Sequence, residues 1–185
     1  MRRALAALLA SGLTLLSTVG LAGSANAAVP PFSGCRYSGS DPTLKIAYSG
    51  SLVEPHRYAL VDAANRWNRT PAPGAFSVSQ TGANIRGWTE YSSETYWAVT
   101  VGSCGSDIYW DTTVDIWFNS RTFDALSTYQ KSVVAVHELG HAYGLAHVQM
   151  NCDGRPSVME QGEEKFGCPL TPPWNDDVIG VQNIY

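Results

Sequence analysis

The amino-acid sequence predicts one domain of the α+β class. Short stretches in which apolar and polar residues alternate are separated by longer stretches with helical spacing, so both kinds of element are expected. The chain has 185 residues and is 44% hydrophobic and 15% charged, which suits one hydrophobic core and excludes a disordered chain or a coiled coil. We find no internal repeat and no inter-domain linker.

The first 27 residues have the pattern of a secretory signal peptide. Arg2 and Arg3 precede an apolar stretch that runs to about Leu21, and Ala25–Ala27 forms a small-residue cleavage site. An uncleaved membrane anchor is the alternative, but serines and glycines interrupt the apolar stretch. We therefore expect a secreted domain, residues 28–185, with no membrane association after cleavage. The net charge of −4 excludes a nucleic-acid partner.

The four cysteines are all in the part that would be exported. An even number of cysteines in an oxidising compartment predicts two disulfides, and four cysteines allow three pairings. We expect Cys152 to pair with Cys168, which closes a short local loop, and Cys35 to pair with Cys104, which ties an N-terminal arm to the middle of the chain. A cysteine metal site is the alternative, but the Cys-x-x-Cys spacing is missing.

The N-terminal part of the exported chain predicts an arm, a strand and a helix. Residues 29–41 are rich in Pro, Gly and Ser and should be extended, and Leu44–Tyr48 alternates like a half-buried strand. Glu54–Asn68 is predicted as a helix, and Pro55 suits its first turn. Pro71–Gly74 stops the helix. Its apolar stripe includes Tyr58, Val61, Ala64 and Trp67.

Strands dominate the middle of the chain. Phe76–Ser79, Thr95–Val101 and Val114–Phe118 are predicted as strands from their apolar and β-branched residues. Another short strand is expected between Thr81 and Glu94, at a position that the pattern does not fix.

The C-terminal part predicts two helices separated by a long loop. A helix should begin near Ser127, because Ser127 and Gln130 have the spacing of a capping box, and Gly144 should end it. Residues 145–174 hold several Gly and Pro residues and should be mostly loop. Asp176–Tyr185 is predicted as a closing helix with acidic residues in its first turn, where the helix dipole favours them.

The segment His137–His147 predicts a metal centre. His137 and His141 are four residues apart on the predicted helix, so both imidazoles project from one face. Gly144 allows the sharp turn that would bring His147 round as a third ligand. Three neutral imidazoles suit Zn²⁺ and leave a fourth position open for water, as a catalytic site requires. The alternative is a helix whose histidines are hydrogen-bonded in the core.

Glu138 follows the first of these histidines and is the predicted catalytic residue. Its carboxylate should point toward the water, take a proton from it and pass that proton to a leaving amine.

The extended motif H-E-x-x-H-x-x-G-x-x-H resembles that of the metzincin metalloendopeptidases, and most closely that of matrixin catalytic domains of the small secreted bacterial kind. Ser157-Val158-Met159 resembles the family's Met-turn, with Met159 beneath the zinc. Val114–Asn119, Ser132–Val136 and Asp176–Tyr185 resemble the strand before the active-site helix, the start of the motif and the closing helix. The specific match covers roughly residues 113–185.

The resemblance implies a fold and an activity. The expected fold is a twisted five-stranded mixed sheet over two long helices, with a small C-terminal subdomain that holds the Met-turn and the last helix. The expected activity is zinc-dependent hydrolysis of peptide bonds in protein or peptide substrates, which would lie extended along Thr95–Val101 of a monomeric enzyme. A secreted zinc-binding module or inhibitor, catalytically silent or narrowly targeted, is the alternative.

The sequence also bears on two further metal sites. Animal matrixins bind a structural zinc through further histidines, but His56 is the only histidine left, and we expect it partly exposed on the first helix. Asp107, Asp111 and Asp115 raise the question of a Ca²⁺ site, although a solvated acidic face is the favoured interpretation because the Asp-x-Asp-x-Asp pattern is missing.

Overall fold

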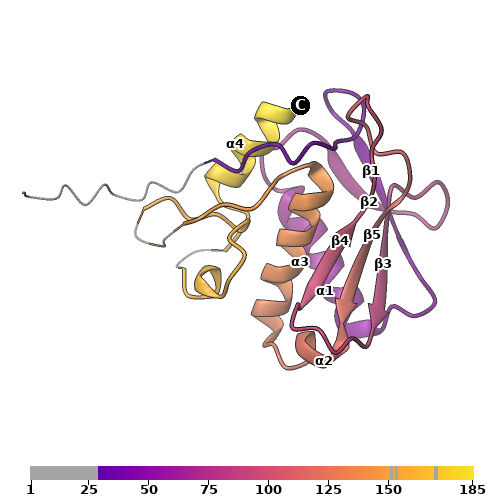
Figure 1. The fold of residues 1–185 in the computed structure, drawn as a ribbon, viewed down its shortest axis with the longest axis vertical. Coiled ribbons are helices and arrows are strands. Elements are labelled where there is room, and N and C mark those ends of the chain that lie inside the picture. The colour runs from indigo at the N-terminus through magenta and orange to yellow at the C-terminus, as the bar shows by residue number, and fades with distance from the viewer. Residues whose placement is uncertain (1–28, 151, 153, 169–170) are drawn as a thin grey trace, which may run out of the picture.

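A computed structural model describes residues 29–150, 152, 154–168 and 171–185 (Figure 1). The predicted signal peptide, residues 1–27, lies outside the described residues. The described chain has the predicted α+β architecture: a five-stranded mixed sheet, two long helices against it and a C-terminal segment that ends in a helix.

The sheet has the strand order β2-β1-β3-β5-β4. Its strands are β1 (Thr43–Tyr48), β2 (Ala75–Val78), β3 (Ile85–Glu90), β4 (Ala98–Val101) and β5 (Val114–Asn119). The first three pairs in this order, β2 with β1, β1 with β3 and β3 with β5, are parallel, whereas β4 runs antiparallel to β5 at the edge. The strand that the sequence left unplaced is β3, in the centre of the sheet.

The two long helices, α1 (Glu54–Trp67) and α3 (Thr128–Tyr143), pack against each other and against the sheet. In Figure 1, α3 lies between the sheet and the C-terminal segment, which contains the single turn η1 (Glu164–Phe166) and the helix α4 (Asn175–Ile184). A four-residue helix, α2 (Ser120–Phe123), follows β5 directly. The core is built from the inward side chains of the strands and the facing sides of the helices, among them Leu44, Ile46, Leu60, Trp67, Ile85, Ile116, Phe118 and Leu139.

Helix α3 begins and ends where its sequence predicts. Ser127 accepts a hydrogen bond from the backbone N–H of Gln130 (3.2 Å), and Gln130 Oε1 accepts one from the N–H of Ser127 (2.9 Å), which completes the capping box. Gly144 ends the helix with φ of 110°, a left-handed conformation that glycine adopts without strain. A Cβ at this position would also lie 2.6 Å from the carbonyl oxygen of Cys35.

The extended arm, residues 29–41, packs along the end of α3. The backbone N–H of Ser33 donates to the carbonyl of Gly144 (2.7 Å), and Arg36 donates to the carbonyl of Ile184 at the end of α4 (2.6 Å). The structure contains two disulfides, with the expected pairing of Cys35 with Cys104 and of Cys152 with Cys168. The first of these joins the arm to the loop after β4.

Two expectations for the first helix are wrong. His56 is fully buried rather than partly exposed: its Nε2 lies 2.7 Å from Asp124 Oδ1, its Nδ1 lies 2.8 Å from Thr89 Oγ1, and its ring contacts Phe123. Tyr58, by contrast, is 66% exposed. Ala64 and Trp67 of the predicted stripe are buried as expected. The buried face differs from the prediction in the first turn, where His56 packs against the phenylalanines of β5 and α2.

Within the described residues, no helix is both long and apolar enough to cross a bilayer.

Candidate active site

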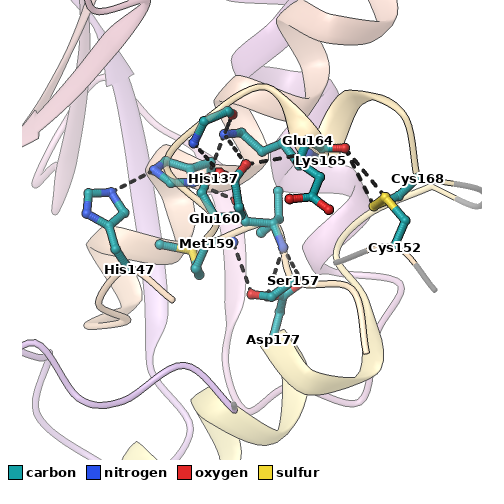
Figure 2. Close-up of polar contacts among 12 residues, drawn as sticks. His137, His147, Cys152, Ser157, Met159, Glu160, Glu164, Lys165, Cys168 and Asp177 are labelled. Carbon is teal, nitrogen blue, oxygen red and sulfur yellow. Dashed lines mark hydrogen bonds and ion pairs between the residues drawn. A yellow bond between two sulfur atoms is a disulfide. The ribbon is translucent and has the colours of Figure 1, made fainter. Parts of the chain in front are cut away.

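The three histidines of the motif converge on one point. His137 and His141 lie in the last turns of α3, and His147 lies in the segment after Gly144. Figure 2 shows His147 beside His137. Their Nε2 atoms form a triangle with sides of 3.0, 3.0 and 3.2 Å. A tetrahedral Zn²⁺ with Zn–N bonds of about 2.0–2.1 Å holds its ligand nitrogens about 3.4 Å apart, so the sides of the triangle are within about 0.4 Å of that spacing.

The hydrogen bonds of the rings show that the donor set fits a cation. His137 Nδ1 lies 2.6 Å from the carbonyl oxygen of Val158, and His141 Nδ1 lies 2.8 Å from that of Leu145. A carbonyl only accepts hydrogen bonds, so each Nδ1 carries the hydrogen and each neutral ring has a bare lone pair on Nε2. Two such lone pairs 3.0 Å apart repel each other, and a metal ion between them removes the repulsion.

The environment keeps the three rings neutral. Burial lowers the pKa of His137 well below its ordinary value of 6.5, and burial is also the largest cause that lowers the pKa of His141 and of His147. Neutral imidazole is the form that binds a metal. Within the described part of the chain, these are the only three His, Cys, Asp or Glu side chains grouped closely enough to hold an ion.

Glu138 is buried beside the triad and has one side-chain partner among the described residues. Thr100 of β4 donates from its hydroxyl to Glu138 Oε2 (2.7 Å) and also lies 3.0 Å from the backbone carbonyl of Glu138. Burial raises the pKa of Glu138 to about 7, although the Thr100 hydrogen bond and the charge of Lys165 oppose the rise. A carboxyl group with a pKa near neutrality is suited to take up and release a proton.

The triad and Glu138 line a cleft of about 690 Å³. One set of lining residues is 95–100, which belong to the edge strand β4 and to the segment before it. Ser33 and Cys35 of the arm line it as well, and so do Gln161 and Lys165 of the C-terminal segment. The cleft therefore brings together parts of the chain that are far apart in sequence, in the position where an extended peptide would meet an edge strand.

The predicted Met-turn lies directly against α3. Met159 is fully buried, and a Cβ on Gly140, one residue before His141, would lie 2.5 Å from its Sδ. The turn is held by Asp177 of α4, whose carboxylate accepts a hydrogen bond from the Ser157 hydroxyl (2.6 Å) (Figure 2). The same carboxylate accepts hydrogen bonds from the backbone N–H groups of Val158 (3.1 Å) and Trp174 (2.8 Å). Burial raises the pKa of Asp177 to about 6 in spite of these hydrogen bonds.

A buried lysine holds the segment that follows. Lys165 is 2% exposed, and its ammonium donates to the carbonyl oxygens of Glu160 (2.6 Å) and Gly162. Its Nζ also lies 3.6 Å from Glu160 Oε2 (Figure 2). The centre of the Trp97 ring is 5.6 Å from the same Nζ. Burial lowers the pKa of Lys165, and the nearby Glu160 carboxylate opposes the shift.

The three acidic residues considered for calcium do not converge on one point. Asp107 and Asp111 both lie near Gly105 in the loop after β4. Asp115, on β5, instead accepts a hydrogen bond from Trp88 Nε1 (2.8 Å). The structure therefore gives no support to a calcium site formed by all three.

Three residues of this site were missed by the sequence interpretation. Thr100 is an ordinary strand residue in the sequence, and Lys165 lies in a segment without periodicity. Asp177 was assigned only to the helix dipole, but its carboxylate also holds the Met-turn. The sequence signal that could have identified Asp177 is the pair Asp176-Asp177, because one of two acids at a helix start faces the preceding chain.

Comparison with known proteins identifies the family of the chain. The family model described as Matrixin (Peptidase_M10) matches residues 61–185, which is more than half of the chain. Among solved structures, that of myroilysin is similar, with 19% sequence identity and a TM-score of 0.42, over 60% of this chain and 44% of that one. A search of curated proteins finds no match. With a histidine triad that could hold a metal ion, the chain belongs to the matrixin family.

Proposed function

We propose that the chain is a secreted zinc endopeptidase in which Glu138 is the general base. The observation that carries the proposal is the position of the Glu138 carboxylate, in the same cleft as three histidines whose Nε2 atoms lie within 3.2 Å of one another. A merely structural zinc site has no need of an acidic side chain beside an open position.

His137, His141 and His147 would hold the ion through Nε2. The Nδ1 bonds of the first two rings would fix their orientation and increase their basicity as ligands. When bound, Zn²⁺ supplies Lewis acidity, which polarises the carbonyl of the bond to be cut and makes a water molecule more acidic.

Glu138 would move the proton. In the first step its carboxylate accepts a proton from the attacking water while the water oxygen bonds to the carbonyl carbon. In the second step the carboxylic acid gives that proton to the amide nitrogen as the C–N bond breaks, so Glu138 returns to its starting form and the product amine is neutral.

The edge strand β4 would bind the substrate. Among the described strands, β4 pairs only with β5, so its outer backbone N–H and C=O groups are available to an extended peptide. This arrangement would lay the peptide across the cleft next to Glu138. Residues 1–27 would serve as the signal for export, after which the two disulfides form in an oxidising compartment.

The alternative function is a secreted zinc-binding module or inhibitor, catalytically silent or narrowly targeted. The presence of Glu138 in the cleft favours the enzyme over a silent module, because a module that only binds zinc has no use for a carboxylate in the same cleft.

The test is to incubate the secreted, disulfide-intact protein with a diverse peptide pool and read the products by mass spectrometry. Internal cuts should occur with the wild type, and they should disappear after chelation and in Glu138→Ala, which should still bind one equivalent of zinc. His141→Ala should lose both zinc and cleavage. Cleavage by a folded Glu138→Ala variant would contradict the proposed base, and stoichiometric zinc in His141→Ala would contradict the ligand set. A zinc-loaded wild type that cuts nothing would favour the alternative.

A further inference from the structure

We infer that Thr100 is a positioning residue for catalysis: its hydroxyl holds one carboxylate oxygen of Glu138 so that the other oxygen faces the cleft. The inference deepens the proposed function and rests on it for its catalytic consequence. It concerns a side chain of β4 and not the ligand triad. The contact that carries it is formed between two side chains of the protein.

The contact is short and specific. Thr100 Oγ1 lies 2.7 Å from Glu138 Oε2, across the interface between β4 and α3. The same hydroxyl lies 3.0 Å from the backbone carbonyl of Glu138, so it contacts both ends of one residue. A hydroxyl has a single hydrogen and can direct it to either acceptor. A charged acceptor forms the stronger hydrogen bond, so the ionised carboxylate draws the hydrogen to Oε2.

The second oxygen, Oε1, is left for the cleft. Among the described residues no side chain or backbone group forms a hydrogen bond with it, yet it is not among the buried polar atoms that lack a partner. Because Glu138 is only 4% exposed and lines the cleft, the exposed part of the carboxylate has to be on this side. Oε1 is therefore the oxygen that is positioned to receive a proton from a water molecule.

Thr100 is a rigid holder for this purpose. Its side chain is branched at Cβ, which restricts χ1, and its strand is fixed by the pairing of Thr100 with Ile116 of β5. Glutamate, in contrast, has three side-chain torsions and could turn its carboxylate away from the cleft. The hydroxyl removes this freedom, and a displacement of a reacting group by about 1 Å can reduce a rate about 100-fold.

The location of Thr100 on β4 also links the base to the substrate. The strand that holds Glu138 in place is the edge strand to which an extended peptide would add. A shift of β4 would therefore move the substrate backbone and the base together, which preserves the distance between them. If Thr100 were only a half-buried strand residue, its substitution would change turnover no more than the accompanying loss of stability does.

The experiment compares Thr100→Val, which has the same shape but no hydroxyl, with Thr100→Ser, which retains the hydroxyl. We expect kcat of Thr100→Val to fall about tenfold to 100-fold with KM and zinc content unchanged, and Thr100→Ser to recover most of kcat. Thr113→Val is the matched control, because it removes a hydroxyl that donates to the Ala83 carbonyl (3.2 Å) outside the cleft. An unchanged kcat in Thr100→Val, or a Thr100→Ser variant as slow as Thr100→Val, would overturn the inference.

A second measurement does not depend on activity. Crystal structures of the zinc-loaded wild type and of Thr100→Val should show the Glu138 carboxylate in one orientation in the wild type and rotated or spread over several in the variant. A carboxylate that superposes in the two structures would overturn the inference. If the wild type cuts no peptide, the proposed function fails, and this comparison still decides whether Thr100 orients Glu138.

Discussion

The carbonyl oxygen of Val158 accepts a hydrogen bond from Nδ1 of His137 over 2.6 Å, so the residue before Met159 orients the first histidine of the triad. The N–H of the same Val158 donates to Asp177, which lies on α4 (Figure 2). The two backbone groups of one residue, Val158, therefore connect the closing helix with the histidine triad. The pairing fixes the His137 tautomer and explains why a carboxylate is buried behind the Met-turn.

Asp177→Asn should weaken zinc binding about tenfold to 100-fold, because an amide offers one oxygen and a competing NH2 group to the three donors that now share a carboxylate. The zinc Kd is measured by competition with a chelating dye. Asp176→Asn is the control, since it removes the same charge from the same helical turn. The Asp176 carboxylate accepts hydrogen bonds from Arg155 and not from the Met-turn. Equal affinities of wild type and Asp177→Asn would show that the turn does not support the ligand.

Gly140→Ala should destabilise the protein although alanine is the better helix former by about 1 kcal/mol. The added Cβ would lie 2.5 Å from Met159 Sδ, and Met159 is fully buried with little room to move. We expect a net loss of roughly 1–3 kcal/mol in the free energy of unfolding, measured in urea with a chelator present so that zinc does not contribute.

The double variant Gly140→Ala, Met159→Ala tests the cause of that loss. Its free energy of unfolding should lie above the value expected from adding the two single effects, because the new methyl group occupies space that the shorter side chain vacates. Simple additivity would mean that the two residues do not compete for that space.

Lys165→Met should unfold at lower urea, with a loss of roughly 3 kcal/mol, because Glu160 would retain a mostly buried charge without its partner. Lys131→Met is the control. Its ammonium also donates to two carbonyls, those of Asp124 (2.9 Å) and Leu126 (2.6 Å), but Lys131 is less buried than Lys165. Similar losses in the two variants would indicate that burial of the ion pair is unimportant.

Asp62 links α1 to α3 and predicts a pH dependence of stability. Partial burial acts to raise the pKa of Asp62, but hydrogen bonds from Ser132 and Arg66 outweigh it, and the pKa lies below the ordinary 3.8. A lowered pKa contributes stability above the ordinary value, and this contribution disappears as the pH falls through the pKa of the folded state. Asp62→Asn should therefore cost about 1 kcal/mol at neutral pH and progressively less in acid.

The measurement for Asp62 is urea unfolding of wild type and variant at neutral pH and near pH 2.5. The difference between the two proteins should narrow toward the acidic end. Glu94→Gln, which removes an exposed acidic charge, should give a small difference at both pH values. A constant difference for Asp62→Asn would contradict the assigned pKa.

Local patterns predicted much of this molecule. The capping box at Ser127 and the glycine at 144 defined α3 to within a residue, because each depends on contacts within one turn of chain. The strand β3 could not be placed for a structural reason. Gly87 occupies its centre where an apolar side chain would mark the pattern, and a Cβ there would lie 2.7 Å from Leu60 of α1.

The first helix shows the limit of periodicity. Its bounds were predicted to within one residue, yet His56 is buried and Tyr58 is exposed. Periodicity along a helix reports which residues share a face, whereas the neighbours that cover that face decide which one is buried. Here Phe118 and Phe123, more than 60 positions away, surround the imidazole.

The sequence by itself determined the helix that carries the first two histidines, the return of the third toward them and the carboxylate next to the first. Those features follow from the spacing of residues four apart on one helix and from a glycine turn, which are properties of neighbouring chain. The tertiary structure alone decided that Thr100 holds Glu138, that Lys165 holds the segment after the Met-turn and that Asp177 supports Val158. Thr100 and Glu138 are 38 positions apart, and Asp177 and Val158 are 19 apart. Such pairs meet only after the sheet, α3 and α4 have packed together, because a side-chain hydrogen bond spans only about 3 Å. No local sequence pattern indicates which distant residue will be the partner.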